Sequence, residues 1–162
     1  METIRNEFVA TLVSETAQLD PHELTLLEAA REAMKKAYAP YSEFRVGAAI
    51  RLSDGTIVTG NNQENAAFPS GLCAERVAFF SAGALYPGAV ITDAAIVASS
   101  ERFEVDHPIT PCGACRQVML EFELNQDVEI RLLFSGNTGK IIRMEGVRNL
   151  LPLFFHESSL RK

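Results

Sequence analysis

The sequence predicts an α/β protein, a three-layer α/β/α sandwich built on a mixed five-stranded sheet. Apolar residues recur at helical spacing after residue 20, and two later segments read as buried helices. Apolar runs of strand length lie between these helices, and a turn signal splits two of the runs into a hairpin. Helices that alternate with strands cover both faces of one sheet. We expect one domain over residues 1–162, with residues 1–20 as an extension of open role.

The first helix is predicted from Pro21 to Tyr38. Asp20 is a favourable N-cap residue, proline suits the first helical position, and Glu23 completes a capping-box pattern. Apolar residues then recur every three or four positions. The dipeptide Ala39-Pro40 ends the helix, because a residue before proline avoids helical backbone angles. The earlier segment Phe8–Val13 is either a strand or a helix turn, and its β-branched content favours an edge strand.

The hairpin is predicted around Ser53-Asp54-Gly55, and the near-continuous apolar run Asp93–Ser99 is typical of a central strand covered on both faces. The remaining predicted elements, in chain order, are the strands Val46–Leu52 and Thr56–Asn61, the helix Leu72–Leu85, the helix Cys112–Phe122, the strands Glu129–Phe134 and Lys140–Met144, and a short helix at Val147–Leu151.

Composition excludes several classes of function. The formal net charge is -6 and the basic residues form no cluster, which argues against a nucleic-acid polymer as partner. No apolar run approaches the ~20 residues of a membrane-spanning helix, and the first residues do not read as a secretory signal. We therefore expect a cytoplasmic protein with no membrane partner. The chain has three cysteines, and an odd number favours metal ligation or nucleophilic chemistry over disulfides.

Two short segments carry the chemistry, Cys73-Ala74-Glu75 and Pro111-Cys112-Gly113-Ala114-Cys115, each at the start of a predicted helix. Cys112 and Cys115 are three residues apart and share one helical face, and Cys73 adds a sulfur from the other helix. Zinc held by three protein ligands keeps a fourth position open for water, the arrangement of catalytic sites. Glu75 is then placed to move protons beside that water without binding the metal.

Two readings without catalysis remain open on the residues alone. The three cysteines are compatible with small hydrophobic core residues. Alternatively, His107 lies five residues before Cys112 and completes a closed structural zinc site of three cysteines and one histidine.

The two segments resemble the cytidine deaminase family in its small, three-cysteine, homotetrameric form, whose zinc-deaminase signature is well known. The resemblance runs from Tyr38 to about Phe155. It also includes the blocks Tyr38–Ala49, Asn62–Ala66 and Leu150-Leu151-Pro152. It implies a cytidine deaminase-like fold and the zinc-dependent hydrolysis of cytidine and deoxycytidine to uridine and deoxyuridine, with release of ammonia. A deaminase of another aminated nucleoside or base is the alternative enzyme.

The resemblance also implies a role for individual residues. Cys73, Cys112 and Cys115 match the Zn2+ ligands, and Glu75 matches the general acid and base. The substrate-binding matches are Asn62 and Glu64 for the ribose 3'-hydroxyl, Phe44 for the pyrimidine ring, the Ala74 backbone for the base, the Thr110 carbonyl for the leaving amine, and Phe155 for a neighbouring subunit's site. Phe68 stands where relatives often carry tyrosine.

Charge balance suggests one further residue. Three thiolates on zinc give a net charge of -1, which opposes deprotonation of a bound water, and two helix N-termini offset only about half a charge each. We expect Arg76 to donate a hydrogen bond to a ligand thiolate, although a surface or interface arginine is the alternative. Phe79, Phe80 and Leu85 exceed the evident needs of a small core, which favours a homotetramer.

Overall fold

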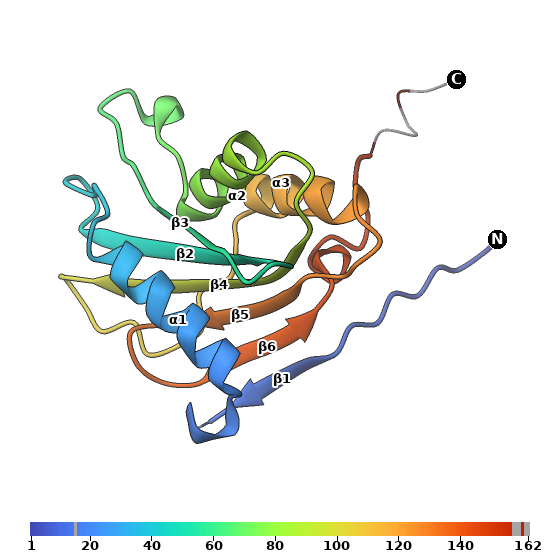
Figure 1. Cartoon of the computed structure of the whole chain (residues 1–162), viewed down its shortest axis with the longest axis horizontal. Coiled ribbons are helices and arrows are strands. Elements are labelled where there is room, and N and C mark those ends of the chain that lie inside the picture. Colours follow the sequence, from blue (N-terminus) through green and yellow to red (C-terminus); the bar gives the residue numbers. More distant parts are fainter. Residues whose placement is uncertain (15, 157–159, 161–162) are drawn as a thin grey trace.

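The computed structural model describes residues 1–14, 16–156 and 160, and its centre is a six-stranded sheet in the order β1-β6-β5-β4-β2-β3 (Figure 1). Strands β4 and β5 pair in parallel and the other neighbours are antiparallel, so the sheet is mixed as predicted. The strands are β1 (Ala10–Val13), β2 (Phe44–Leu52), β3 (Ile57–Asn61), β4 (Ile91–Ser100), β5 (Arg131–Ser135) and β6 (Ile141–Glu145). The helices are α1 (Pro21–Met34), α2 (Ala74–Leu85) and α3 (Gly113–Leu124), with 3-10 turns at Thr16–Gln18, Phe68–Ser70 and Val147–Leu150.

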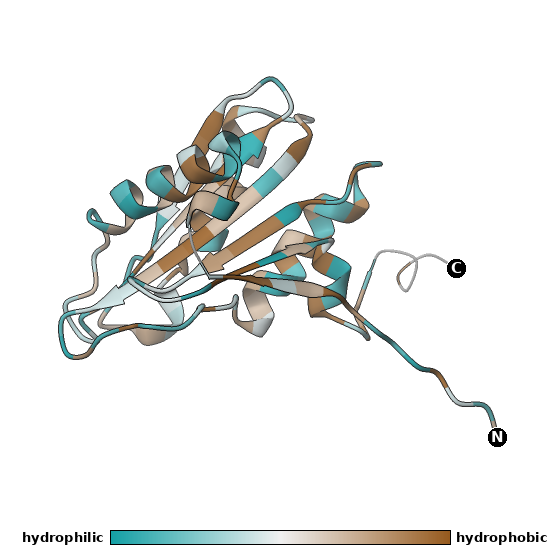
Figure 2. Cartoon of the chain, turned by 90° about the horizontal axis from the view of Figure 1, so that it is seen from below, coloured by the Kyte–Doolittle hydropathy of each residue, from teal (hydrophilic) through white to brown (hydrophobic). Residues whose placement is uncertain are grey.

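The helices lie on both faces of the sheet, which confirms the three-layer sandwich. Alternate residues of β2 show the division: Ala48 and Ile50 pack in the cluster that contains α2 and α3, whereas Ala49 packs in the cluster that contains α1. Successive side chains of a strand point to opposite faces, so an apolar run such as β4 is buried from both sides. Figure 2 shows the same arrangement, with brown apolar strands between helices that carry teal polar residues.

Two predicted features of the fold are wrong in detail. The sheet has six strands rather than five. The edge strand favoured for the segment Phe8–Val13 is confirmed over Ala10–Val13, where β1 pairs with β6, and it is the strand that the predicted count left out. The capping box of Asp20 and Glu23 is confirmed, but α1 ends at Met34 and does not reach Tyr38. Tyr38 instead donates its N–H to the Asn62 carbonyl at 3.0 Å, and its carbonyl accepts from the N–H of Glu64 at 2.8 Å. The chain therefore leaves the helix to pair with the segment after β3.

Two glycines allow helices to approach the sheet closely. A Cβ atom added to Gly47 in β2 would lie 2.0 Å from the Ala30 carbonyl oxygen of α1. A Cβ atom added to Gly60 in β3 would lie 2.5 Å from the Ala74 carbonyl oxygen, in the first turn of α2. The residue before that turn is Cys73, so the contact at Gly60 fixes the N-terminal end of α2 against the sheet.

Within the part of the chain that the structure describes, no helix combines the length and the apolar character needed to cross a membrane. The first nine residues lead away from β1 toward the N-terminus at the margin of the sheet (Figure 1).

Candidate metal centre and adjoining cavity

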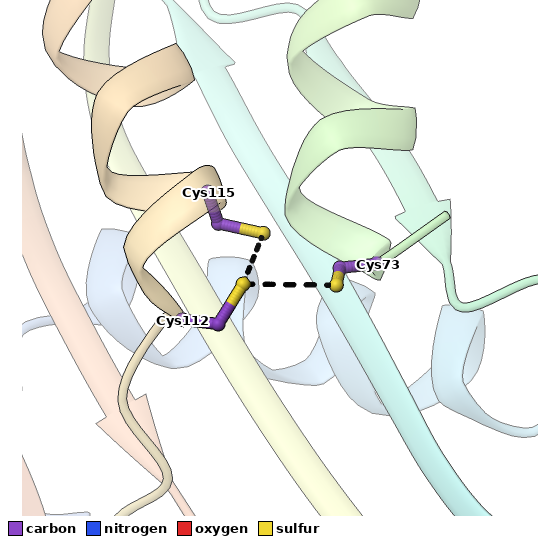
Figure 3. Close-up of side chains that lie close together, drawn as sticks. All are labelled: Cys73, Cys112 and Cys115. Carbon is purple, nitrogen blue, oxygen red and sulfur yellow. Dashed lines mark hydrogen bonds between the residues drawn. The ribbon is translucent and has the colours of Figure 1, made fainter. Parts of the chain in front are cut away.

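Three cysteine sulfurs meet where α2 and α3 begin (Figure 3). Cys73 is the N-cap residue of α2, Cys112 is the N-cap residue of α3, and Cys115 lies in the first turn of α3. The sulfurs of Cys73 and Cys112 are 3.9 Å apart, those of Cys112 and Cys115 are 3.5 Å apart, and all three lie within 4.8 Å of one another. Both predicted segments therefore converge on one point.

The spacing of these sulfurs fits a zinc ion. Zinc–sulfur bonds of ~2.3 Å in tetrahedral geometry place neighbouring sulfurs ~3.8 Å apart. The sulfur–sulfur distances of 3.9 and 3.5 Å bracket that value, so the arrangement fits a zinc ion. His107 is not a member of the ligand group among the described residues; its imidazole is exposed, and Nδ1 lies 3.2 Å from an oxygen of Asp106. The structure gives no support to a closed site with His107 as the fourth ligand.

The surroundings of the sulfurs favour the thiolate form of Cys73. A hydrogen bond from the Cys115 thiol, together with Arg76 and Cys112, lowers the pKa of Cys73 to about 5 although burial opposes the shift. The pKa of Cys115 is raised in turn, because its thiol donates to Cys73 and is buried. Nη2 of Arg76 lies 3.6 Å from the Cys73 sulfur, so the expected contact between Arg76 and a thiolate is present. Both helices also begin at this point, where their N-terminal ends carry partial positive charge.

A cavity of about 820 Å³ adjoins the sulfurs. It lies where β2 begins and β3 ends, and the first turn of α2 forms part of its lining. Its lining includes most of the residues predicted for the site, namely Phe44, Asn62, Glu64, Cys73, Ala74, Glu75, Arg76, Thr110 and Cys112. Cys112 is exposed, so one side of the sulfur group opens into the cavity.

Glu75 lies in the first turn of α2, and its side chain reaches the cavity while the residue is only 5% exposed. Burial raises the pKa of Glu75 above its ordinary value, and the negative charge of Cys73 acts in the same direction. A carboxyl group in this environment takes up a proton more readily than a carboxyl group in water. Such a group can accept and return protons beside the sulfur group.

Asn62 follows β3 and is tied to the start of β2 by its side chain. Its Oδ1 accepts from the Val46 N–H at 2.7 Å, and its Nδ2 donates to the Phe44 carbonyl at 2.9 Å. The amide thus takes the place of a backbone pair at the end of the β2–β3 ladder. One lone pair on Oδ1 and one hydrogen on Nδ2 remain for another partner.

Glu64 is held by the turn that precedes β2. Its carboxylate accepts from the backbone N–H groups of Tyr41 at 2.8 Å and Ser42 at 3.3 Å, and from the Ser42 hydroxyl. Burial by itself raises the pKa of Glu64, but these hydrogen bonds outweigh it and the pKa lies below its ordinary value. Glu64 therefore presents a fixed, ionised carboxylate to the cavity.

Of the predicted site residues, all of which the structure describes, two do not line this cavity: the buried Cys115, and Phe155. Phe155 is exposed, and its carbonyl accepts a hydrogen bond of 2.8 Å from Nε2 of Gln117 on α3. The role of Phe155 in a neighbouring subunit stays a prediction. The expectation that Phe79 exceeds the needs of the core is wrong, because Phe79 is fully buried against Phe122. Phe80 and Leu85 are exposed, as that expectation requires.

Sequence reasoning missed the residues that hold the site in shape. Glu43 has a φ of 55°, rare for a residue with a side chain, and its carboxylate lies 3.1 Å from Nη2 of Arg102. The same Nη2 donates to the Tyr41 carbonyl at 3.2 Å, so Arg102 fixes the turn that binds Glu64. The acceptor here is a backbone carbonyl, which no side-chain pattern reveals. At the mouth of the cavity, Tyr41 and Phe68 meet edge to face with ring centroids 6.0 Å apart.

Comparison with known proteins gives a consistent result. Residues 21–129 match the family described as the cytidine and deoxycytidylate deaminase zinc-binding region. A cytidine deaminase of Sporosarcina psychrophila is 47% identical over 136 residues, which cover 83% of this chain and 92% of that protein. A cytidine deaminase of Halalkalibacterium halodurans is 41% identical over 127 residues, which cover 78% of this chain and 89% of that protein. The crystal structure of a cytidine deaminase from Burkholderia pseudomallei is similar with a TM-score of 0.69 and 41% identity, covering 85% of this chain and 100% of that chain.

Proposed function

The chain belongs to the cytidine and deoxycytidylate deaminase family, and from that premise we propose that it hydrolyses the 4-amino group of cytidine and deoxycytidine. The products are the uracil nucleoside and ammonia. The observation that carries the proposal is the convergence of three cysteine sulfurs beside a buried glutamate at the wall of an 820 Å³ cavity. This arrangement supports a metal site, a proton carrier and room for a nucleoside in one place.

Cys73, Cys112 and Cys115 are the residues that would hold zinc. Zinc bound there supplies Lewis acidity, which makes water a nucleophile at neutral pH. Arg76 donates to the Cys73 sulfur and offsets part of the negative charge of the three thiolates. The exposed side of Cys112 leaves access from the cavity, as a site with an open coordination position requires.

Glu75 carries the protons of the reaction. It accepts a proton from the attacking water and delivers it to N3 of the cytosine ring, while the water oxygen forms a bond to C4. A second proton passes from that oxygen through Glu75 to the amino nitrogen, and the bond between C4 and nitrogen breaks to release ammonia. One carboxyl group must therefore change protonation state twice, and a raised pKa brings it nearer to the pH at which it works.

The remaining lining residues position the nucleoside. Asn62 and Glu64 bind the ribose 3'-hydroxyl, which their spare hydrogen-bonding capacity supports. Phe44 packs against the pyrimidine ring, the backbone at Ala74 holds the base, and the Thr110 carbonyl receives the leaving amine. None of these residues is assigned to the 2'-position, so deoxycytidine is accepted as well.

The experiment is a measurement of ammonia release from cytidine, deoxycytidine, cytosine and cytidine monophosphate, with zinc determined in the same preparation. We expect one zinc per chain and activity on the two nucleosides. Zinc without ammonia release would favour a non-catalytic zinc protein. Equal efficiency on cytosine or on the monophosphate would favour a deaminase of another aminated ring.

We further propose a homotetramer in which Phe155 completes the cavity of a neighbouring subunit. Phe80, Leu85 and Phe155 are apolar and exposed in the single chain, and covering them needs a partner surface. We also propose that the protein works in the cytoplasm, where a reducing environment keeps zinc-binding thiols from oxidation. Light scattering tests the assembly, and a fully active monomer would contradict it.

A further inference from the structure

Thr110 and Pro111 form the loop that leads into α3 at Cys112, and the loop has few hydrogen bonds of its own. Pro111 has no N–H group. Outside helices and strands, no backbone–backbone hydrogen bond between described residues involves Thr110 or Pro111. The hydrogen bonds that hold these two residues come from Arg116, one residue beyond Cys115.

A single guanidinium group makes three contacts at this loop. Nε of Arg116 donates to the Pro111 carbonyl at 2.8 Å, and Nη2 donates to Oγ1 of Thr110 at 3.3 Å. Nη1 donates to the carbonyl of Leu150 at 3.0 Å, which belongs to the segment that follows β6. The planar arginine fork can hold all three acceptors at once, whereas a lysine ammonium is a point charge without that fixed geometry.

Thr110 also lines two cavities. One is the cavity of the metal centre, and the other is a second cavity of about 560 Å³ that Arg116 lines as well. Thr110 is exposed and faces both cavities, so it has little packing to keep it in place. The guanidinium reaches Thr110 from the second cavity and supplies that restraint.

We infer that Arg116 is a positioning residue for the deamination, because it fixes the Thr110–Pro111 loop between the substrate cavity and the zinc-binding end of α3. The inference rests on the proposed function and assigns to it a residue that does not line the substrate cavity. A displacement of ~1 Å in a positioning element can lower a rate by ~100-fold. Loss of Arg116 therefore lowers kcat by about 10- to 100-fold and changes KM less.

The test compares Arg116→Ala and Arg116→Lys with the wild-type enzyme in kcat, KM, zinc content and thermal midpoint. Arg148→Ala is the matched control, because Arg148 lines the same second cavity and is exposed. We expect a lower kcat for Arg116→Ala with zinc retained, an intermediate value for Arg116→Lys, and wild-type kinetics for Arg148→Ala. Guanidinium chloride, far below denaturing concentrations, should restore part of the kcat of Arg116→Ala, because the second cavity admits the ion; potassium chloride should not.

The outcomes separate the two levels of the argument. A wild-type enzyme without ammonia release contradicts the proposed function itself. An active wild type with an unchanged kcat in Arg116→Ala contradicts only the positioning role. Loss of activity that merely follows zinc loss, with no recovery in guanidinium, also contradicts it and indicates a purely structural arginine. If Arg116→Ala does not fold, Arg116→Lys still decides, because a wild-type kcat in that variant shows that the fork geometry is not needed.

Discussion

Replacement of Glu75 by glutamine separates catalysis from metal binding. The amide has the same shape as the carboxyl group and leaves Cys73, Cys112 and Cys115 in place, so zinc should stay at one per chain. A positioned acid and base contributes ~100- to 10,000-fold to a rate. Since each factor of ten is worth ~1.36 kcal/mol, the barrier should rise by about 2.7 to 5.4 kcal/mol. The measurement is kcat from ammonia release together with zinc content, and a variant within tenfold of the wild type would refute the role of Glu75.

The same replacement should make the protein more stable. Glu75 is 5% exposed and burial raises its pKa, so the folded state resists ionisation that the unfolded state permits. Below the unfolded pKa both states are protonated and the penalty is absent. It grows as pH rises through the unfolded pKa and is complete above the folded pKa. Glu75→Gln removes the penalty, so its thermal midpoint should exceed that of the wild type by an amount that increases from acid to neutral pH. A difference that shrinks over that range would contradict the reasoning.

Glu123 offers a matched control, because it is equally buried but fully used by the fold. Its carboxylate on α3 accepts from the backbone N–H groups of Ile130 at 2.9 Å, Val147 at 2.8 Å and Arg148 at 3.2 Å. A glutamine there turns an amide toward these donors and loses charge-assisted hydrogen bonds worth ~1.5–3 kcal/mol each. We expect Glu123→Gln to lower the free energy of unfolding by at least about 2 kcal/mol, with near-normal kcat per folded molecule. Glu75→Gln should thus lower kcat and raise stability, whereas Glu123→Gln should lower stability and leave kcat nearly unchanged.

Three further outcomes follow from the site. Gly60→Ala should destabilise the protein by about 1–3 kcal/mol through overpacking against α2. Gly113→Ala should not destabilise it in this way, because no atom lies within 4 Å of the added Cβ. Equal thermal midpoints for the two variants would contradict the close contact at Gly60. Arg76→Gln should move the acidic limb of the kcat profile to higher pH, because a cation that stabilises the thiolate of Cys73 is lost; an unmoved limb removes Arg76 from that role. Glu64→Gln should raise KM for cytidine more than it lowers kcat. Free cytosine should be at least ~100-fold poorer than cytidine in kcat/KM, because without a sugar Glu64 has no hydroxyl to bind. Equal efficiency on cytosine would contradict sugar recognition.

The layers of the fold were predictable because both periodicities are local. Apolar spacing and the capping box located α1, and the continuous apolar run located β4. The end of α1 was misjudged because Ala37 is buried and continues the apolar pattern, although it lies outside the helix. Strand β1 is short and mostly exposed, so its pattern does not separate a strand from a helix turn; only its pairing with β6 decides.

The cluster of three cysteines was predictable for a different reason. The spacing of Cys112 and Cys115 brings two sulfurs onto one helix face, and the placement of Cys73 at another helix start adds the third. The supports of the site were not predictable, because they use backbone acceptors that are distant in sequence. Arg116 reaches a carbonyl 34 residues away, and the side chain of Asn62 replaces a backbone pair 16 and 18 residues away. Sequence patterns name side chains, whereas these contacts depend on where the folded backbone places its carbonyl groups.

The two glutamates of the cavity show why the fold can assign a different task to each. Glu64 accepts three hydrogen bonds from the turn at Tyr41 and Ser42, which lower its pKa and keep it ionised. Glu75 is buried beside the charge of Cys73, which raises its pKa. Carboxyl groups whose environments move their pKa values apart suit separate roles, and this difference supports the proposal that Glu64 is a fixed acceptor and Glu75 the proton carrier. Exchange of these proposed roles would require Glu64 to give up its hydrogen bonds and Glu75 to gain them, so the surroundings of each carboxyl group decide which of the two takes up a proton more readily.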